Sequence, residues 1–198
     1  QEHRSVLPPG SSKSVTSDMR TKILLLFFIA LLKASSILAQ QDIKVRIHSD
    51  KIVHSIDFIV FSGTYQLQDT AGNTVKLFNK GDSLHIEPLN YDLVILTKSD
   101  TIFCGNHLKL RSVGFLNIFQ LTAGKSTRLY DDDLIVSLRV DKSLRLLNEV
   151  ELEHYVAGVV QAEAGIAKNP EFYKVQAVAA RTYTLKNIDK HAEEDFQM

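Results

Sequence analysis

The chain has 198 residues, of which 44% are hydrophobic, and its 23 lysines and arginines balance 23 aspartates and glutamates. This globular composition without net charge argues against a nucleic-acid binder held by bulk charge. A single cysteine excludes a disulfide framework and a cysteine-rich zinc module within these residues.

The first 39 residues are predicted to lie outside the mature protein. Residues 1–18 are polar, lack periodicity and precede the first methionine, so we interpret them as upstream translation that the native protein lacks. Residues 19–39 have the features of a secretory signal peptide: a basic start, an apolar run over 23–32 and small residues up to Ala39. The run is shorter than the about 20 residues of a membrane-spanning helix, although an uncleaved anchor or a core helix stays an alternative. We therefore expect an exported protein of the periplasm or cell envelope.

Residues 40–128 are predicted to form a β-rich N-terminal module. Their apolar residues are β-branched or aromatic and occur in short runs between turn residues, which is typical of a sandwich or a barrel-like module. The clearest alternation, over 43–47, indicates a half-buried strand. The expected strands are 43–47, 55–61, 74–78, 83–87, 93–96, 101–104, 108–111 and 115–121.

Residues 129–198 are predicted to follow this module as a second part with a hairpin and two helices, which makes the fold class α+β. The hairpin strands are 134–140 and 144–147. From Leu152 the apolar residues then recur at helical spacing, and Gly165 can end that first helix in a left-handed conformation.

A second helix is predicted to begin at Asn169-Pro170, because asparagine is a good N-cap and proline suits the first helical position. No cap closes the chain before Met198. We therefore expect a fragment whose C-terminal part is missing.

Glu163 is the candidate catalytic residue that the helical spacing singles out. Seven residues of a helix return to within about 20° of the start, so Glu163 continues the apolar stripe through Val156. A carboxyl group on a buried face holds its proton more strongly, because burial disfavours the charged form, and this suits a glycosidic general acid. The alternative is that the helix frays at Ala162 and that Glu163 points to water or caps the next helix.

Further polar candidates lie on the second helix. Gln176 and Tyr183 are seven residues apart and share a face, which could edge a substrate groove or make ordinary surface hydrogen bonds. Arg181 lies off that line and could pair with a substrate carboxylate or with a nearby glutamate.

The sequence indicates no metal site from its own ligand spacing. Cys104 and His107 offer two soft ligands where structural zinc wants four, and 131–133 lacks the spaced oxygens of a calcium loop and is predicted to be a solvated turn. His191 stands alone late in the second helix.

The stretch 148–192 resembles the stage II sporulation protein D (SpoIID/LytB) family. The resemblance rests on Tyr155, on Gly-Val-Val at 158–160 followed three residues later by Glu163, and on Gln-Ala-Val-Ala-Ala-Arg-Thr-Tyr at 176–183. It covers roughly 129–196, so residues 129–198 are identified as a partial, C-terminally truncated domain of this kind.

This resemblance implies a peptidoglycan lytic transglycosylase that cuts between N-acetylmuramic acid and N-acetylglucosamine in denuded glycan strands. It places the catalytic acid on Glu163 and offers Gln176, Arg181 and Tyr183 as residues that hold the sugar. The chemistry needs no cofactor. A zinc site that involves the missing C-terminal part is an option, with His191 as one ligand.

Two alternatives to the enzyme stay open. The LytB branch of the family implies a non-catalytic cell-wall-binding protein that enhances a separate amidase, and a third option is a structural envelope β-protein. An acidic residue at 163 favours the enzyme, whereas basic cell-wall repeats would favour the amidase partner. The expected partners are therefore peptidoglycan strands and an amidase, and no nucleic acid.

Overall fold

The computed structural model describes residue 22 and residues 41–69, 71–165, 169–191, 193 and 196–198. The predicted upstream segment 1–18 and signal peptide 19–39 lie outside these residues, apart from Lys22. Asp42–Met198 form one compact unit. Within the described ranges, no helix is both long and apolar enough to cross a membrane.

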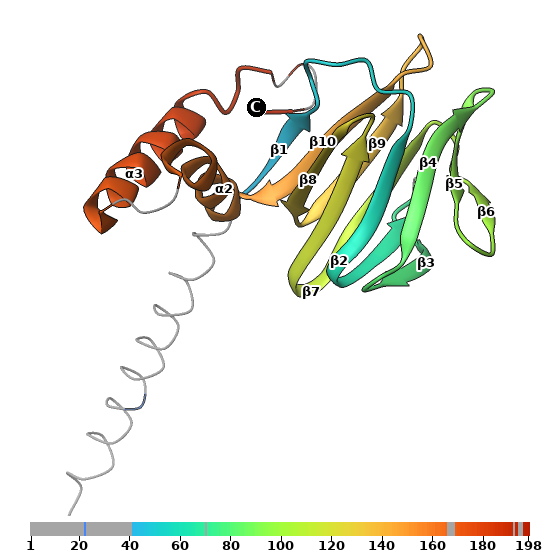
Figure 1. The fold of residues 1–198 in the computed structure, drawn as a ribbon, viewed down its shortest axis with the longest axis horizontal. Coiled ribbons are helices and arrows are strands. Elements are labelled where there is room, and N and C mark those ends of the chain that lie inside the picture. Colours follow the sequence, from blue (N-terminus) through green and yellow to red (C-terminus); the bar gives the residue numbers. More distant parts are fainter. Residues whose placement is uncertain (1–21, 23–40, 70, 166–168, 192, 194–195) are drawn as a thin grey trace, which may run out of the picture. The chain divides into compact units, whose positions relative to one another are not determined.

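The described strands join in one ten-stranded antiparallel sheet, and two helices follow it in the chain, which confirms the predicted α+β class (Figure 1). The strand order is β1-β10-β9-β7-β2-β4-β5-β6, while β3 pairs with β2 and β8 with β7. The strands are β1 (Asp42–Ile47), β2 (Ile56–Gln68), β3 (Thr74–Asn79), β4 (Ser83–Leu89), β5 (Asp92–Leu96), β6 (Thr101–Phe103), β7 (His107–Ala123), β8 (Ser126–Asp131), β9 (Asp133–Leu138) and β10 (Leu144–Glu151).

The long strands β2 and β7 run side by side and organise the core. One half of β2 pairs with β4 and the other with β3, while β7 pairs first with β9 and then with β8. Phe58, Tyr65 and Phe119 meet in the main core cluster, with ring centroids 4.9–5.9 Å apart. Such aromatic contacts add to the burial of apolar area that holds the two halves together.

A bulge in the middle of β2 and β7 changes which residues face the core. The buried positions of β2 shift from Phe58 and Val60 to Tyr65 and Leu67, which a strand of strict period two does not allow. Opposite this point, β7 inserts 114–117, because Thr64 pairs with Val113 and Ser62 with Ile118.

Asn117 and Gly63 hold the bulge in place. The buried Asn117 side chain accepts a hydrogen bond from the Thr64 N–H (3.0 Å) and donates one to the Gly114 carbonyl (3.0 Å). Gly63 has φ +79°, and a Cβ there would lie 2.0 Å from Asn117 Oδ1. Only glycine fits this close approach.

The helical hairpin consists of α2 (Leu152–Ala164) and α3 (Pro170–Lys186), which follow β10 directly (Figure 1). Asn169 caps α3 as predicted, with its side chain accepting from the Glu171 N–H at 2.9 Å. The helices are antiparallel, because the start of α2 contacts the end of α3 through Glu153 and Arg181. At the other end, the Tyr173 hydroxyl donates to the Gly165 carbonyl at 3.0 Å.

The C-terminal residues lie along the edge strand β1. The Arg46 N–H donates to the Met198 carbonyl (2.7 Å) and the Gln197 N–H donates to the Lys44 carbonyl (2.8 Å). Phe196 is buried against Ile135 and Leu147. This segment therefore satisfies backbone groups of a sheet edge that would otherwise face water.

Candidate functional site

The hairpin is fixed to the sheet by a small apolar cluster of its own. Leu152 and Val156 of α2 pack with Ile43 of β1 and Val150 of β10, and Ala177 and Ala180 of α3 pack against the same cluster. Alanines at these positions let the two helices approach closely. The cluster fixes α2, which carries the candidate acid Glu163 in its last turn.

Glu163 is exposed, so the prediction that it continues the buried stripe is wrong. The buried residues of α2 are Leu152, Val156 and Ala164, which lie at multiples of four positions. A row of residues four positions apart turns slowly around the helix axis, so the buried side ends on Ala164. The seven-residue repeat counted from Val156 instead selects Glu163, one residue earlier. The helix does not fray at Ala162, since α2 extends to Ala164.

Tyr155 connects Glu163 to the second helix electrostatically. Its ring is half-buried against the apolar cluster, and burial raises the pKa of its hydroxyl, with further raising contributions from the charges of Glu163 and Tyr183. The candidate acid and Tyr183 therefore both lie within electrostatic range of this one side chain. Tyr155 was part of the family resemblance but was not a predicted site residue.

The other predicted site residues occupy different parts of α3. Gln176 is half-buried on the side that also holds Ala177 and Ala180, whereas Tyr183 is 58% exposed. Arg181 is exposed and pairs with Glu153 of α2. Of the two options for Arg181, the pairing with a nearby glutamate is the one present in this structure.

The turn between β8 and β9 meets the start of α2. Asp132, with φ +63°, accepts hydrogen bonds at Oδ2 from the Glu151 N–H (3.1 Å) and from His154 Nδ1 (3.0 Å). Asp133 is buried and accepts from both the N–H and the hydroxyl of Ser112. The prediction of a solvated turn is therefore wrong for Asp133.

Asp132 and His154 were missed as site residues by the sequence analysis. One signal was available in the sequence, namely the acidic residues that precede α2. A carboxylate is stabilised next to the N-terminus of a helix, so one of them could be expected to lie there. Their proximity depends on the pairing of β8 and β9 with β7, which the sequence does not specify.

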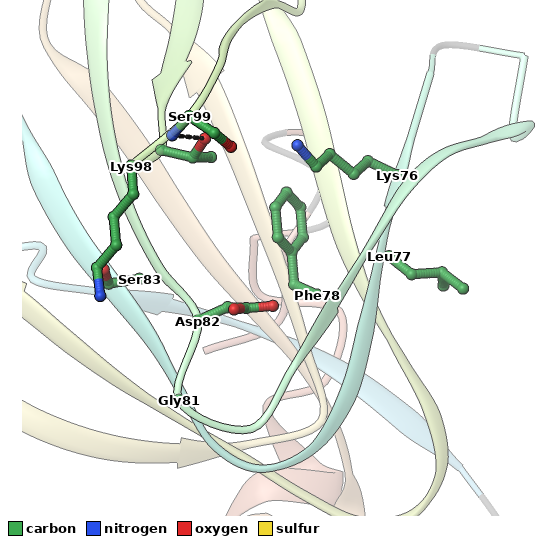
Figure 2. Close-up of a pocket in the computed structure, with 9 residues that line it drawn as sticks. Lys76, Leu77, Phe78, Gly81, Asp82, Ser83, Lys98 and Ser99 are labelled. Carbon is green, nitrogen blue, oxygen red and sulfur yellow. Dashed lines mark hydrogen bonds between the residues drawn. The ribbon is translucent and has the colours of Figure 1, made fainter.

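The hollow in Figure 2 lies away from the hairpin, between the β3–β4 and β5–β6 turns, and has a volume of about 150 Å³. Two of its charged groups have internal partners: Lys76 pairs with Asp100, and Asp82 Oδ2 accepts from the Asn79 N–H. These contacts give Lys76 and Asp82 a structural role in the strands and turns around the hollow. The lining residues are Lys76, Leu77, Phe78, Gly81, Asp82, Ser83, Thr97, Lys98 and Ser99.

His191 does not form a zinc site with the described residues. Its ring stacks on Phe196 with the ring centroids 4.8 Å apart and the planes at 13°. No group of three or more histidine, cysteine, aspartate or glutamate side chains in the described part of the chain could hold a metal ion. Burial raises the pKa of the Cys104 thiol to about 11, which disfavours the thiolate that zinc binds.

Residues 140–198 match the family model described as SpoIID: Stage II sporulation protein. The predicted resemblance is thus confirmed over this part of the chain, which includes Glu163, Gln176, Arg181 and Tyr183. No curated protein and no solved structure matches the chain. The match indicates a protein related to sporulation or the cell wall.

Proposed function

We propose that the protein is a peptidoglycan lytic transglycosylase with Glu163 as its acid and base. The observation that carries the proposal is the family match over 140–198, which contains both helices of the hairpin and the exposed Glu163 carboxyl at the end of α2. The signal-peptide pattern over 19–39 supports action in the periplasm or cell envelope.

One carboxyl group is sufficient for this reaction. Glu163 protonates the glycosidic oxygen that leaves, and the 6-hydroxyl of the muramic acid attacks its own anomeric carbon. The Glu163 carboxylate then accepts the proton of that hydroxyl, so the products are a 1,6-anhydro sugar and a new free end, with no water consumed. Because nucleophile and electrophile belong to one sugar, the second carboxylate of ordinary glycosidases is not needed.

The exposure of Glu163 agrees with a long polymer as the substrate. A glycan strand can reach an exposed carboxyl on a helix end without entering a closed cavity, and the strand itself then excludes water from the reacting bond. Gln176 and Tyr183 on α3 are the side chains that we assign to holding the sugar. Arg181 can join them only if it leaves Glu153.

A second candidate function is a wall-binding protein that enhances a separate amidase. The exposure of Glu163 also favours this alternative, because the sequence predicted a desolvated acid and the structure has a solvated one. Binding alone requires no proton donor, so the two functions differ in what happens to the strand after it has bound.

The test is product analysis on denuded glycan strands with the full chain. We expect fragments about 18 mass units lighter than hydrolysis products from the wild type. Glu163→Gln should lower their rate at least about 100-fold, the usual contribution of a general acid. Glu171→Gln is the matched control, since Glu171 is also an exposed glutamate on this hairpin and its side chain pairs with Lys174 on the surface of α3.

If the folded wild-type protein binds the glycan strands but never cuts them, the transglycosylase proposal is overturned. The alternative, a wall-binding protein that enhances an amidase, is then favoured. If wild type and Glu163→Gln are equally active, the protein is an enzyme but its general acid is a residue other than Glu163.

A further inference from the structure

We propose that Asp132 and His154 form a pH-sensitive clasp that positions α2, and with it Glu163, on the sheet. The clasp itself follows from contacts at the start of α2, whereas its importance for the reaction rests on the proposed function. Asp132 lies before the region 140–198 that matches the family model, so the β-rich part of the chain supplies this contact.

The clasp joins three elements at one carboxylate. Asp132 Oδ2 lies 3.0 Å from His154 Nδ1 and 3.1 Å from the Glu151 nitrogen, while His154 Nε2 lies 3.7 Å from Glu151 Oε2. A carboxylate only accepts hydrogen bonds, so His154 donates from Nδ1. The imidazole is therefore held between one carboxylate of the β8–β9 turn and one at the end of β10.

Asp132 is itself held in place from the sheet. Its backbone N–H donates to the Asn117 carbonyl at 3.2 Å, and the buried Asn117 side chain is fixed by Thr64 and Gly114. The anchor therefore belongs to the bulge of β7, which the Asn117 hydrogen bonds hold in place. A carboxylate held at this point also stabilises the N-terminal end of the α2 dipole.

Movement of the clasp reaches Glu163 through the helix. Nine residues separate His154 from Glu163, which is about 13 Å along a helix axis. A helix transmits a change of tilt at its start to its far end as a displacement. Displacements of about 1 Å lower the rates of positioned reactions by up to about 100-fold.

The charges around His154 determine the direction of the pH effect. The hydrogen bond to Asp132 is the largest cause that raises the pKa of His154, opposed by burial and supported by Asp132, Glu151 and Asp131. On the same helix, Glu153 is engaged by Arg181 of α3. The charged imidazolium is therefore favoured in the folded protein.

The direction in which pH changes the stabilisation by His154 follows from the linkage between proton binding and folding. Because the pKa of His154 is higher in the folded than in the unfolded protein, its stabilisation is complete below the unfolded value of about 6.5. It is lost as the pH rises through the higher folded value. The clasp is thus closed below about pH 6.5 and is weakened as the pH rises through the higher folded pKa of His154.

The experiment compares wild type, His154→Gln and Asp132→Asn in the full chain between pH 5.5 and 8.5. Hydrogen exchange of the α2 amides and the NMR titration of the His154 ring report the clasp directly, and product formation from denuded strands reports its effect on the reaction. His85→Gln is the matched control, because His85 also lies between two carboxylates, 2.7 Å from Asp57 and 3.6 Å from Glu87, but on β4 of the sheet.

We expect the protection of the wild-type α2 amides, measured against their intrinsic exchange rate at each pH, to fall as the pH rises through the folded pKa of His154. The two variants should show low protection at every pH. In the variants kcat at pH 6 should fall about tenfold with KM changed less than twofold. Asp132→Asn should also lower the His154 titration midpoint. His85→Gln should behave as the wild type in each measurement.

Protection of α2 that does not change with pH in the wild type, or equal protection in wild type and His154→Gln, would overturn the clasp. If the wild type cuts no strands at any pH, the proposed enzyme fails, and the exchange and titration data still decide the clasp.

Discussion

The guanidinium of Arg181 on α3 donates to the carboxylate of Glu153 on α2 and joins the end of one helix to the start of the other. Both side chains are about half exposed, at 52% and 45%. An exposed pair of this kind adds only about 0–1 kcal/mol to stability. Arg181 could therefore exchange Glu153 for an anionic group of the proposed glycan substrate at small cost in stability.

The first prediction separates the two roles of Arg181. Arg181→Gln and Glu153→Gln should each lower the free energy of unfolding by less than about 1 kcal/mol, and the double variant should lower it no further, because both remove the same pair. If Arg181 holds the glycan, only Arg181→Gln raises KM for denuded strands. Urea unfolding and strand-cutting assays on the four proteins measure both effects.

An equal rise of KM in Glu153→Gln would contradict this assignment. Arg181 would then act through the geometry of the hairpin rather than by contact with the strand.

The second prediction concerns the close approach of Gly63 to Asn117. Gly63→Ala should lower the free energy of unfolding by about 2–4 kcal/mol, because the new Cβ meets Asn117 Oδ1 at 2.0 Å and the backbone keeps φ +79°. Gly72→Ala is the control: it has φ +84° but no atom within 4 Å of the new Cβ, so it should cost about 1 kcal/mol. Urea denaturation at one pH measures both.

Equal costs for the two substitutions would show that the strained backbone alone, and not the contact with Asn117, requires glycine at position 63.

The same bulge explains why the sequence predicted the sheet only in part. The expected strands 55–61, 108–111 and 115–121 end or begin beside Gly63 and Gly114, where glycine indicates a turn. In the structure both segments continue through bulges and form the single long strands β2 and β7. The strand β8 was not predicted, because its exposed residues show no clear alternation of polar and apolar side chains.

The helices were easier to predict than the environment of Glu163. Helix caps are local, so Asn169 and the region near Gly165 could be placed from sequence, and α3 begins at Pro170. Which side of α2 is buried depends on the packing against Ile43 and Val150, which no periodicity in α2 specifies. The contact between Asp132 and His154 is non-local for the same reason.

The third prediction concerns the hydroxyl of Tyr65, which is buried in the core without a hydrogen-bond partner among the described residues. Tyr65→Phe should leave the free energy of unfolding unchanged or raise it by up to about 1 kcal/mol, because the variant removes a buried group that water satisfies in the unfolded chain. Tyr130→Phe is the control and should destabilise slightly, since its hydroxyl lies 3.5 Å from His48 Nε2. Thermal and urea unfolding measure both.

A loss of more than about 1 kcal/mol in Tyr65→Phe would mean that a buried water molecule bonds the hydroxyl in solution.

The last prediction concerns Phe196, which fixes the C-terminal segment to the sheet. Phe196→Ala should lower the free energy of unfolding by about 3 kcal/mol, because the ring is only 5% exposed and fills a cluster with Ile135 and Leu147. The backbone hydrogen bonds of Gln197 and Arg46 should lose protection with it, as hydrogen exchange can measure. Phe115→Ala is the control: its ring is 97% exposed, so its removal should change stability by less than about 0.5 kcal/mol. Equal and small effects of both substitutions would show that residues 196–198 leave the sheet edge in solution, and the edge of β1 would then be open to pair with another strand.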